Sequence, residues 1–366
     1  MLHPCSISLL GKQRNGSPRL WCVIHRARAA AFDRCTTANP TRPRLKKKTL
    51  DLAAYPGGVA LWGALPPVVN TAGAECETGV HLHARSVAGD VKDIDETFDE
   101  VTVIDGSDRV TITADAATAY NVSRLFGQQL EYLACPHCGE PHVDANEFAV
   151  KPHRKHLCLA CGRDFYDSSP SIGNPIALLA ERYGRNRSVV TPNRPLRITH
   201  TECPGGFQVW GTHPAILWTG PKPEESGIHV HAFRHGEAIP IVDETYDRVE
   251  IDGHVLDPAQ VRLLMAQLAV PSLAKRLVTA ECPRCGEAQF DAGIDGAVPR
   301  RERRCTQCGS NFVTTGRRKI VISNPMLAVA MKINELTKRR RSRSLSAAGS
   351  RRPPASAGKQ RRLRPS

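Results

Sequence analysis

Short runs of β-branched and apolar residues, each bounded by Gly, Pro or Asp, dominate the hydrophobic pattern in the first part of the chain. They are Val59–Trp62, Val80–Ala84 and Val101–Ile104. Runs of this length and composition are typical of β-strands. We therefore expect a β-rich segment here.

A helical period follows the strands, because apolar residues then recur three and four positions apart. One such face is Val122, Leu125, Phe126 and Leu130, and a second is Val261, Leu264, Met265 and Leu268. Asp257 and Pro258 precede the second face as a side-chain cap and a proline at the first helical position. Two further helices are expected over Ile176–Tyr183 and Met326–Leu336, each after an Asn-Pro pair.

Much of this pattern occurs twice. Three groups of residues recur 148 positions later along the chain. Pro56-Gly57-Gly58 and Trp62-Gly63 recur as Pro204-Gly205-Gly206 and Trp210-Gly211. Gly79 to Ala84 recurs as Gly227 to Ala232, and Asp95 to Asp99 recurs as Asp243 to Asp247. A fixed offset of this size indicates an internal repeat. We predict an α+β fold made of two tandem copies of one β-rich module, residues 55–185 and 203–336, joined by a linker over 186–202. Each module carries an embedded cysteine motif and a C-terminal helix.

The positive charge of the chain lies at its two ends. Of a net charge of +14, residues 1–50 contribute +10 and residues 338–366 contribute +11, which leaves −7 for the middle. Both ends have a composition typical of disordered segments, and the basic run from Lys338 is expected to extend the last helix and fray. Residues 1–50 also fit an organellar transit peptide, a basic nucleic-acid arm, or an extension without a role.

Eight of the thirteen cysteines form two sets of paired Cys-x-x-Cys motifs, with nineteen residues between the pairs of each set. We call Cys135, Cys138, Cys158 and Cys161 the first cysteine quartet, and Cys282, Cys285, Cys305 and Cys308 the second. Paired motifs with this spacing supply the four thiolates that a structural Zn²⁺ ion prefers. Gly139, Gly162, Gly286 and Gly309 follow the second cysteine of each pair, where a knuckle needs a residue that tolerates positive φ. Two structural zinc ions are therefore expected.

These motifs resemble the zinc-ribbon class over two stretches, Cys135 to Phe165 and Cys282 to Phe312. The resemblance implies that the ribbons bind nucleic acid or dock on proteins. Disulfides and redox pairs are the alternatives. A disulfide framework suits small secreted domains, and a redox motif usually comes singly near a βαβ pattern.

The remaining composition fits a globular protein in a reducing, cytoplasm-like compartment. Apolar residues make up 41% of the 366 positions, and no apolar run approaches the roughly 18 residues of a membrane span. No membrane partner is expected. The cysteines outside the quartets have no paired spacing.

A His-x-His pair in each module could carry chemistry. His81 and His83, and likewise His229 and His231, alternate along a predicted strand and so share one face. A carboxylate could complete each set, from Asp95 or Glu96 and from Asp243 or Glu244. Such a site could support metal-assisted hydrolysis or oxygen activation. The alternative is a half-buried pair that forms hydrogen bonds across the sheet. The carboxylates lie too far along the chain from the histidines to match the cupin pattern.

Two other motifs favour structural interpretations. Asp and Thr in Asp95-Glu96-Thr97 and Asp243-Glu244-Thr245 are typical of turns, where they satisfy local backbone N–H groups. The Pro-Gly-Gly motifs lack the spacing of a phosphate-binding loop and predict a tight turn before a strand.

Cationic residues precede the second knuckle of each quartet. The runs are Lys151-Pro152-His153-Arg154-Lys155-His156 and Arg300-Arg301-Glu302-Arg303-Arg304. Arg154, Lys155, Arg300, Arg301, Arg303 and Arg304 are candidates for contacts with phosphates, or they belong to solvated charged strands. The leading hypothesis is a non-enzymatic zinc-binding protein that contacts DNA or RNA. The runner-up is a metal-dependent enzyme that uses the His-x-His pairs, and a third hypothesis is a protein–protein adaptor.

Overall fold

The computed structural model describes residues 46–72, 79–87, 92–314 and 320–349. The expectations for residues 1–45 and 350–366 fall outside the described residues. Here we call residues 46–186 the first half and residues 187–349 the second half.

The first half is strand-rich and has two α-helices among its described residues. Its strands are β1 (Lys47–Asp51), β2 (Gly58–Ala64), β3 (Val69–Asn70), β4 (Gly79–Arg85), β5 (Ile94–Phe98), β6 (Glu100–Asp105), β7 (Asp108–Thr113), β8 (His153–Leu157) and β9 (Asp164–Ser171). Its helices are α2 (Ala114–Leu125) and α3 (Ile176–Tyr183), with 3-10 turns η1 (Leu52–Ala54), η2 (Asn146–Ala149) and η3 (Gly184–Asn186).

The second half has the same kinds of elements in a similar order. Its strands are β10 (Val189–Val190), β11 (Pro195–Ile198), β12 (Gly206–Gly211), β13 (Leu217–Trp218), β14 (Glu224–Glu225), β15 (Ile228–Phe233), β16 (Val242–Tyr246), β17 (Arg248–Ile251), β18 (His254–Leu256), β19 (Leu277–Val278), β20 (Glu302–Arg304), β21 (Asn311–Val313) and β22 (Ile322–Ser323). Its helices are α4 (Pro258–Ala269), α5 (Pro271–Ala274) and α6 (Met326–Gly349), with the 3-10 turn η4 (Gly293–Gly296). The mixed α+β class is confirmed.

Corresponding sheets have corresponding strand orders. The four-stranded sheets are β13-β2-β4-β5 and β16-β15-β12-β3, and the three-stranded sheets are β1-β6-β7 and β11-β17-β18. Hairpins β8-β9 and β20-β21 carry the second knuckles of the quartets, and two small sheets pair β10 with β14 and β19 with β22. The expected strands over Val59–Trp62, Val80–Ala84 and Val101–Ile104 lie within β2, β4 and β6.

Each half contributes one strand to the four-stranded sheet of the other half. In β3 of the first half, Val69 pairs with Val209 of β12, and in β13 of the second half, Leu217 pairs with Leu61 of β2. The chain crosses closely at these points, since a Cβ atom on Gly206 (φ +103°) would lie 2.7 Å from Thr71 Oγ1. The tight turn predicted before these strands therefore also accommodates the exchanged segment.

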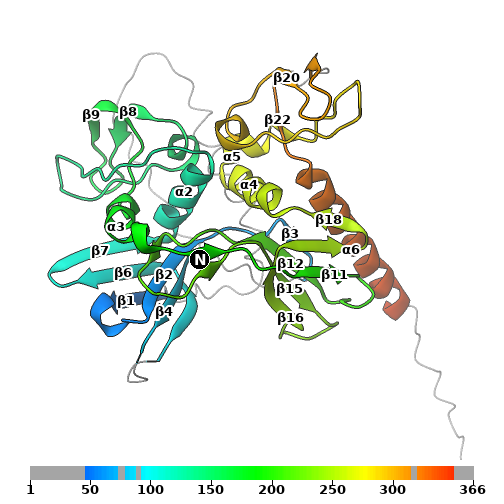
Figure 1. The fold of residues 1–366 in the computed structure, drawn as a ribbon, viewed down its shortest axis with the longest axis horizontal. Helices are drawn as coiled ribbons and strands as arrows, with labels where there is room; N and C mark the ends of the chain where they lie inside the picture. The colour runs from blue at the N-terminus through cyan, green and yellow to red at the C-terminus, as the bar shows by residue number, and fades with distance from the viewer. Residues whose placement is uncertain (1–45, 73–78, 88–91, 315–319, 350–366) are drawn as a thin grey trace, which may run out of the picture. The chain divides into compact units, whose positions relative to one another are not determined.

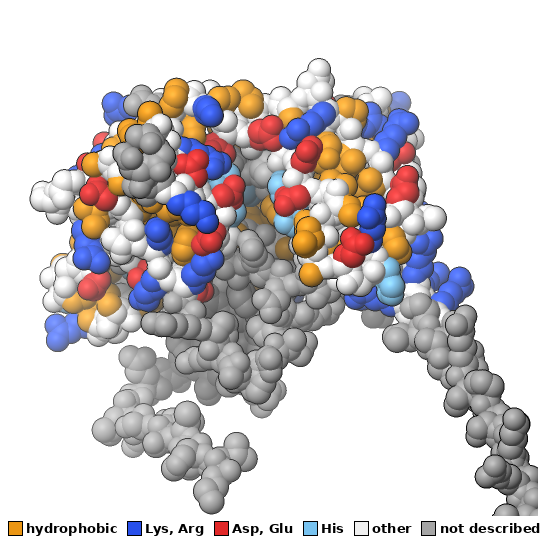
Figure 2. Space-filling model, turned by 90° about the horizontal axis from the view of Figure 1, so that it is seen from below, with side chains coloured by type: hydrophobic (Ala, Val, Ile, Leu, Met, Phe, Trp, Pro, Cys, Tyr) orange, Lys and Arg blue, Asp and Glu red, His pale blue; other side chains and the backbone are white. Residues whose placement is uncertain are grey.

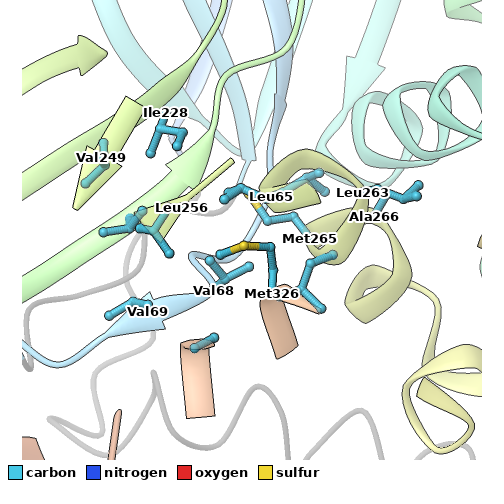
Figure 3. Close-up of a cluster of buried hydrophobic side chains, with 14 of the residues drawn as sticks. Leu65, Val68, Val69, Ile228, Val249, Leu256, Leu263, Met265, Ala266 and Met326 are labelled. Atoms are coloured by element: carbon cyan, nitrogen blue, oxygen red, sulfur yellow. The ribbon is translucent and has the colours of Figure 1, made fainter. Parts of the chain in front are cut away.

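The exchanged segments are buried in the core of the opposite half. Leu65, Val68 and Val69 pack with Ile228, Val249 and Met265 of the second half, as Figure 3 shows. Ile216 and Leu217 are packed in the core of the first half in the same way. Helices α2 and α4 also contact each other (Figure 1). The two halves therefore form one interlocked body.

The helix starts follow the predicted caps. Asp257 Oδ1 accepts a hydrogen bond from Gln260 N at 3.1 Å, with Pro258 at the first position of α4. Asn174 and Asn324 accept hydrogen bonds from the backbone N–H groups of Ile176 and Met326, both at 3.0 Å. Helix α3 has the expected bounds. Helix α6 continues past Leu336 to Gly349, so the basic run from Lys338 extends the last helix as expected, and residues 338–349 are helical although their composition favoured disorder.

Two expected boundaries are wrong. Residues 47–50, assigned to a disordered extension, lie in β1, where parallel pairing with β6 buries Leu50 completely. The expected linker over 186–202 contains β10 and β11, and β11 pairs with β17. In both cases the stabilising partner lies about fifty residues further along the chain, so the local composition gives no signal.

Candidate metal centres

Both cysteine quartets come together in the structure. In the first quartet, Cys135 Sγ lies 3.7 Å from Cys161 Sγ, and Cys138 Sγ lies 3.6 Å from Cys158 Sγ. In the second quartet the equivalent distances are 3.8 Å and 3.5 Å, between Cys282 and Cys308 and between Cys285 and Cys305. All four sulfurs of each quartet lie within 4.8 Å of one another.

These separations fit a tetrahedral zinc ion. A Zn–S bond of about 2.3 Å gives sulfur–sulfur edges of about 3.8 Å. A disulfide would need an S–S distance of about 2.0 Å. The glycines that follow each pair have φ between 69° and 77°, as the knuckle requires. In addition, backbone N–H groups of Cys161 and Ala160 lower the pKa of Cys158 to about 6, which favours the thiolate. Both quartets could hold metal ions, and zinc suits them best.

The His-x-His pairs lie on the central strands of the two four-stranded sheets. On β4, His81 and His83 are directly opposite Trp62 and Ala60 of β2 on one side. On the other side they are opposite Thr97 and Asp95 of β5. Residues opposite each other in an antiparallel pair project from the same face. The strand register therefore brings Asp95 beside the two imidazoles.

Three donor atoms converge in what we call the first His–Asp centre, formed by His81, His83 and Asp95. The Nε2 atoms of the two histidines are 3.1 Å apart. Asp95 Oδ1 lies 3.4 Å from His81 Nε2 and 3.2 Å from His83 Nε2. Metal–nitrogen and metal–oxygen bonds of about 2.0–2.2 Å give donor–donor edges of about 2.8–3.1 Å in an octahedral site and about 3.3–3.6 Å in a tetrahedral one. The distances fit a single metal ion held by three protein ligands.

The outer nitrogens of these imidazoles are engaged by oxygen atoms. His83 Nδ1 donates to Glu224 Oε1 at 3.3 Å, and His81 Nδ1 lies 2.8 Å from Thr97 Oγ1. Glu224 is an acceptor when ionised, so neutral His83 carries its hydrogen on Nδ1 and directs the lone pair of Nε2 toward Asp95. Metal-ligating histidines almost always donate their other N–H in this way.

The second His–Asp centre, formed by His229, His231 and Asp243, has the same geometry. The two Nε2 atoms are 3.1 Å apart, and Asp243 Oδ1 lies 3.2 Å from His229 Nε2 and 2.9 Å from His231 Nε2. His229 Nδ1 lies 3.0 Å from Thr245 Oγ1, a contact equivalent to that of His81 Nδ1 with Thr97 Oγ1 at 2.8 Å. The same ligand arrangement is thus built twice.

The carboxylates in both centres are held in the ionised form. Hydrogen bonds with His81 and then His83 lower the pKa of Asp95, and a hydrogen bond with His229 lowers the pKa of Asp243. Burial disfavours a charged His83, but Asp95 and Glu224 outweigh burial and raise its pKa to about 9. The ligand set therefore attracts a positive charge, either a proton or a metal ion.

Both centres line one cavity of about 1170 Å³. Histidine side chains are visible on both sides of a hollow near the middle of the face in Figure 2. Trp62 packs against both imidazoles of the first centre with ring centroids 4.8 Å and 4.7 Å away, and Trp210 does so in the second. Trp218 also lines the cavity. The walls combine these aromatic rings with charged side chains, and the centres open onto a space large enough for an organic molecule.

The structure distinguishes between the candidate carboxylates. Glu96 forms an ion pair with Lys46 at 3.0 Å, and Glu244 forms one with Arg194 at 3.3 Å, so the aspartates are the groups that meet the histidines. The turn interpretation of these motifs is wrong, because Ile94–Phe98 and Val242–Tyr246 are strands. Glu224 was missed because it is 141 positions from His83 and no local pattern links them.

The basic runs are only partly available to a phosphate. Arg303 is buried and pairs with Asp291, and Arg300 pairs with Asp291 at 2.6 Å and with Asp295 at 2.9 Å. The expectation that Arg303 faces a phosphate is therefore wrong, whereas Arg300 stays partly exposed. Lys155 pairs with Asp164 at 2.7 Å but remains exposed, as do Arg154, Arg301 and Arg304. Alternation along β20 is the signal that could have identified the inward residue.

Another group of potential ligands includes histidines of the first basic run. His142, Asp144 and His156 are buried, and their donor atoms lie within 4.8 Å of one another. His153 approaches the same carboxylate, with its Nε2 atom 3.2 Å from Asp144 Oδ1.

Comparison with protein-family models, with curated proteins and with solved structures finds no match to this chain. Among the described residues, no helix has both the length and the apolar character needed to cross a membrane. The residues themselves therefore carry the functional inference.

Proposed function

We propose that the protein is a metal-dependent enzyme whose two His–Asp centres face a common cavity, while zinc ions in the two cysteine quartets stabilise the ribbons. The observation that carries this proposal is the convergence of His81, His83 and Asp95, repeated by His229, His231 and Asp243, on the walls of one space.

Electrostatics favours a metal ion in the first centre. While His83 is neutral, its Nδ1 donates to Glu224 and the lone pair of Nε2 faces the ionised Asp95 across 3.2 Å. These lone pairs repel each other unless a proton or a metal ion lies between them. An added proton would relieve one contact, whereas a divalent ion satisfies the lone pairs of His81, His83 and Asp95 together.

Three protein ligands leave coordination positions open toward the cavity. A divalent ion bound there would supply Lewis-acid activation of water or of a substrate oxygen. Glu224 fixes the orientation of His83, and Thr97 and Thr245 do the same for His81 and His229. Trp62 and Trp210 offer flat apolar surfaces to a substrate and limit the access of water to the centres.

Manganese is a suitable probe, because thiolates select zinc whereas carboxylate and water ligands suit Mn²⁺. Protein that carries zinc in the cysteine quartets but has free His–Asp centres should bind two Mn²⁺ ions per chain in an electron paramagnetic resonance titration. The bound ions should also enhance the relaxation of water protons, since their open positions hold exchangeable water. The variant Asp95→Asn with Asp243→Asn should lose both signals.

Glu96→Gln with Glu244→Gln is the matched control, because these neighbours on the same strands pair with Lys46 and Arg194 instead. Its manganese binding should equal that of the unmodified protein. If the variant Asp95→Asn with Asp243→Asn bound as much manganese as the unmodified protein, the proposal would be refuted.

We also infer that the two halves are copies of one module. Val69 and Leu217 support this, because they are 148 positions apart and take equivalent registers in exchanged sheets. The quartets and the His–Asp centres recur at nearly the same offset. The thiolate ligands imply a reducing, cytoplasm-like compartment.

Contact with nucleic acid is a second candidate function, favoured by the exposed Arg154, Arg301 and Arg304 on the hairpins and by the basic run from Lys338 along α6. Arg301→Ala with Arg304→Ala should reduce retention on DNA or RNA at low salt. Unchanged retention would assign any binding to other basic segments.

A protein partner is the remaining proposal. Leu159 and Tyr166 on the first ribbon are 80% and 72% exposed and suit docking. Partner capture that survives nuclease and raised salt, and that Tyr166→Ser abolishes, would support it.

A further inference from the structure

A buried carboxylate in the first ribbon is surrounded by three histidines. Asp144 Oδ1 lies 2.8 Å from His142 Nε2 and 3.2 Å from His153 Nε2, and Asp144 Oδ2 lies 3.2 Å from His156 Nδ1. Asp144, His142 and His156 are at most 5% exposed. Phe165 packs against the rings of His142 and His156, and Phe148 packs against His153. We call these four polar residues the Asp144 cluster.

The second ribbon holds an aspartate in the same backbone setting. Asp144 N donates to Gly173 O, and Asp291 N donates to Ser323 O, both at 2.9 Å. In return, Gly173 N donates to Asp144 Oδ2 at 2.7 Å, and Ser323 N donates to Asp291 Oδ2 at 2.8 Å. The two carboxylates occupy equivalent positions, 147 residues apart.

The side chains around the two carboxylates differ in charge. Asp291 pairs with the guanidinium groups of Arg303 and Arg300, which stay charged at all ordinary pH values. At the same offset, the first ribbon has His156 and His153, and His142 stands in place of Gln289. A buried carboxylate without a compensating cation is strongly unfavourable. The first ribbon must therefore neutralise Asp144 in another way.

The tautomer of His153 indicates how the first ribbon neutralises the charge of Asp144. His153 Nδ1 lies 3.0 Å from the backbone oxygen of Lys151, which can only accept, so the ring carries a hydrogen on Nδ1. Neutral His153 then presents a bare Nε2 lone pair to Asp144 Oδ1. An N–H that donates to a backbone carbonyl is typical of a histidine that binds a metal through its other nitrogen.

We propose that the Asp144 cluster binds a further transition-metal ion, of the Zn²⁺ class, which takes the place that two guanidinium groups fill in the second ribbon. His142 Nε2, Asp144 Oδ1 and His156 Nδ1 are the core ligands, and His153 Nε2 closes the fourth position. Four nitrogen and oxygen ligands in a buried setting describe a structural site. His153, the most exposed member with 15% of its side chain accessible, marks the entry path. This site is independent of the His–Asp centres.

The second ribbon supplies a variant that should fold without this ion. His142→Gln, His153→Arg and His156→Arg together install the partners of Asp291 around Asp144. Elemental analysis of zinc-reconstituted protein should give one ion per chain fewer in this triple variant than in the unmodified protein, with the far-UV circular dichroism unchanged. Arg154→Gln with Lys155→Gln, two exposed neighbours, is the control and should leave the count unchanged. An equal ion count in the folded triple variant would refute the proposal.

Nitrogen-15 NMR of the histidine rings in the unmodified, zinc-loaded protein provides a test that does not depend on the variant folding. Metal-bound rings of His142, His153 and His156 should keep one fixed tautomer between pH 6 and 8 and change on chelation. Rings that carry protons on both nitrogens in the zinc-loaded protein would instead show that a proton neutralises Asp144, and would overturn the proposal.

Discussion

Leu217 of the second half pairs with Leu61 of the first, in the register in which Val69 of the first half pairs with Val209 of the second. Leu217 and Val69 are each completely buried in a core that belongs mainly to the other half. The exchange places both His–Asp centres around one cavity, and it carries the following segment with Glu224 to His83. The sites therefore depend on the interlocking of the halves.

Leu217→Ala should destabilise the whole protein and not only the second half. Truncation of a buried leucine costs about 2–5 kcal/mol, because apolar contacts are lost and a cavity remains. Chemical denaturation should show a single transition at lower denaturant concentration. Val255→Ala, at a position that is 42% exposed, should change the free energy of unfolding by less than about 0.5 kcal/mol. A cost below about 1 kcal/mol for Leu217→Ala would argue against a shared core.

Loss of one thiolate should release one zinc ion and unfold only its ribbon. Cys305→Ser removes a buried ligand of the second quartet, so zinc-reconstituted protein should hold one ion fewer, and amide hydrogen exchange should increase over 282–314. Cys203→Ser, at a buried cysteine outside both quartets, keeps every proposed ligand and should leave the ion count unchanged. Equal zinc content in the Cys305 variant would exclude the second quartet as a zinc site.

Glu224→Gln should weaken metal binding at the first His–Asp centre only. Loss of an outer carboxylate partner typically lowers metal affinity by about 10–100-fold, because the histidine loses its fixed orientation and part of its basicity. A manganese titration should therefore change from two similar affinities to one strong and one weak.

Glu225→Gln is the control, since Glu225 pairs with Arg194 and does not contact His83. If both manganese affinities were unchanged in the Glu224 variant, Glu224 would not contribute to metal binding at the first His–Asp centre.

His213 should make stability depend on pH below neutrality. This side chain is buried beside Arg262 and Arg124, and burial followed by these charges lowers its pKa to about 3. A histidine with a lowered pKa stabilises the fold above its unfolded value of about 6.5, and that contribution is lost as the pH falls toward 3. Near pH 5 the loss amounts to about 2 kcal/mol.

His213→Leu places at this position the residue found 148 positions earlier, Leu65. Between pH 7 and pH 5 the variant should lose less stability than the unmodified protein, by about 2 kcal/mol in denaturation experiments. Parallel stability curves for the two proteins would contradict this account of His213.

Patterns that act within a few residues were sufficient to predict most elements. The caps at Asp257, Asn174 and Asn324 fix the starts of α4, α3 and α6, because side-chain capping is a local interaction. The cysteine spacing predicted both quartets for the same reason. Partners that are distant in sequence could not be predicted. β3 and β13 have two residues each and exist through exchange, not through propensity.

The His–Asp centres were predictable only in part. Alternation placed the histidines of each pair on one face, but Asp95 and Thr97 suggested a turn, because both residue types favour turns. Only the register of β4 against β5 brings Asp95 to His83. Similarly, Arg303 and His156 resembled members of a surface charge run, yet both are buried against an aspartate. Composition does not indicate which residue of a short strand faces inward.

The number of metal ions per chain tests the central claim most directly. Zinc-reconstituted protein and the variant His81→Ala with His229→Ala should be compared by elemental analysis at matched protein concentration. Our account predicts that the variant holds two ions fewer while the ribbons keep theirs. An equal ion count in the two proteins would mean that the His–Asp centres do not bind metal and that the cavity is not a metal-dependent active site.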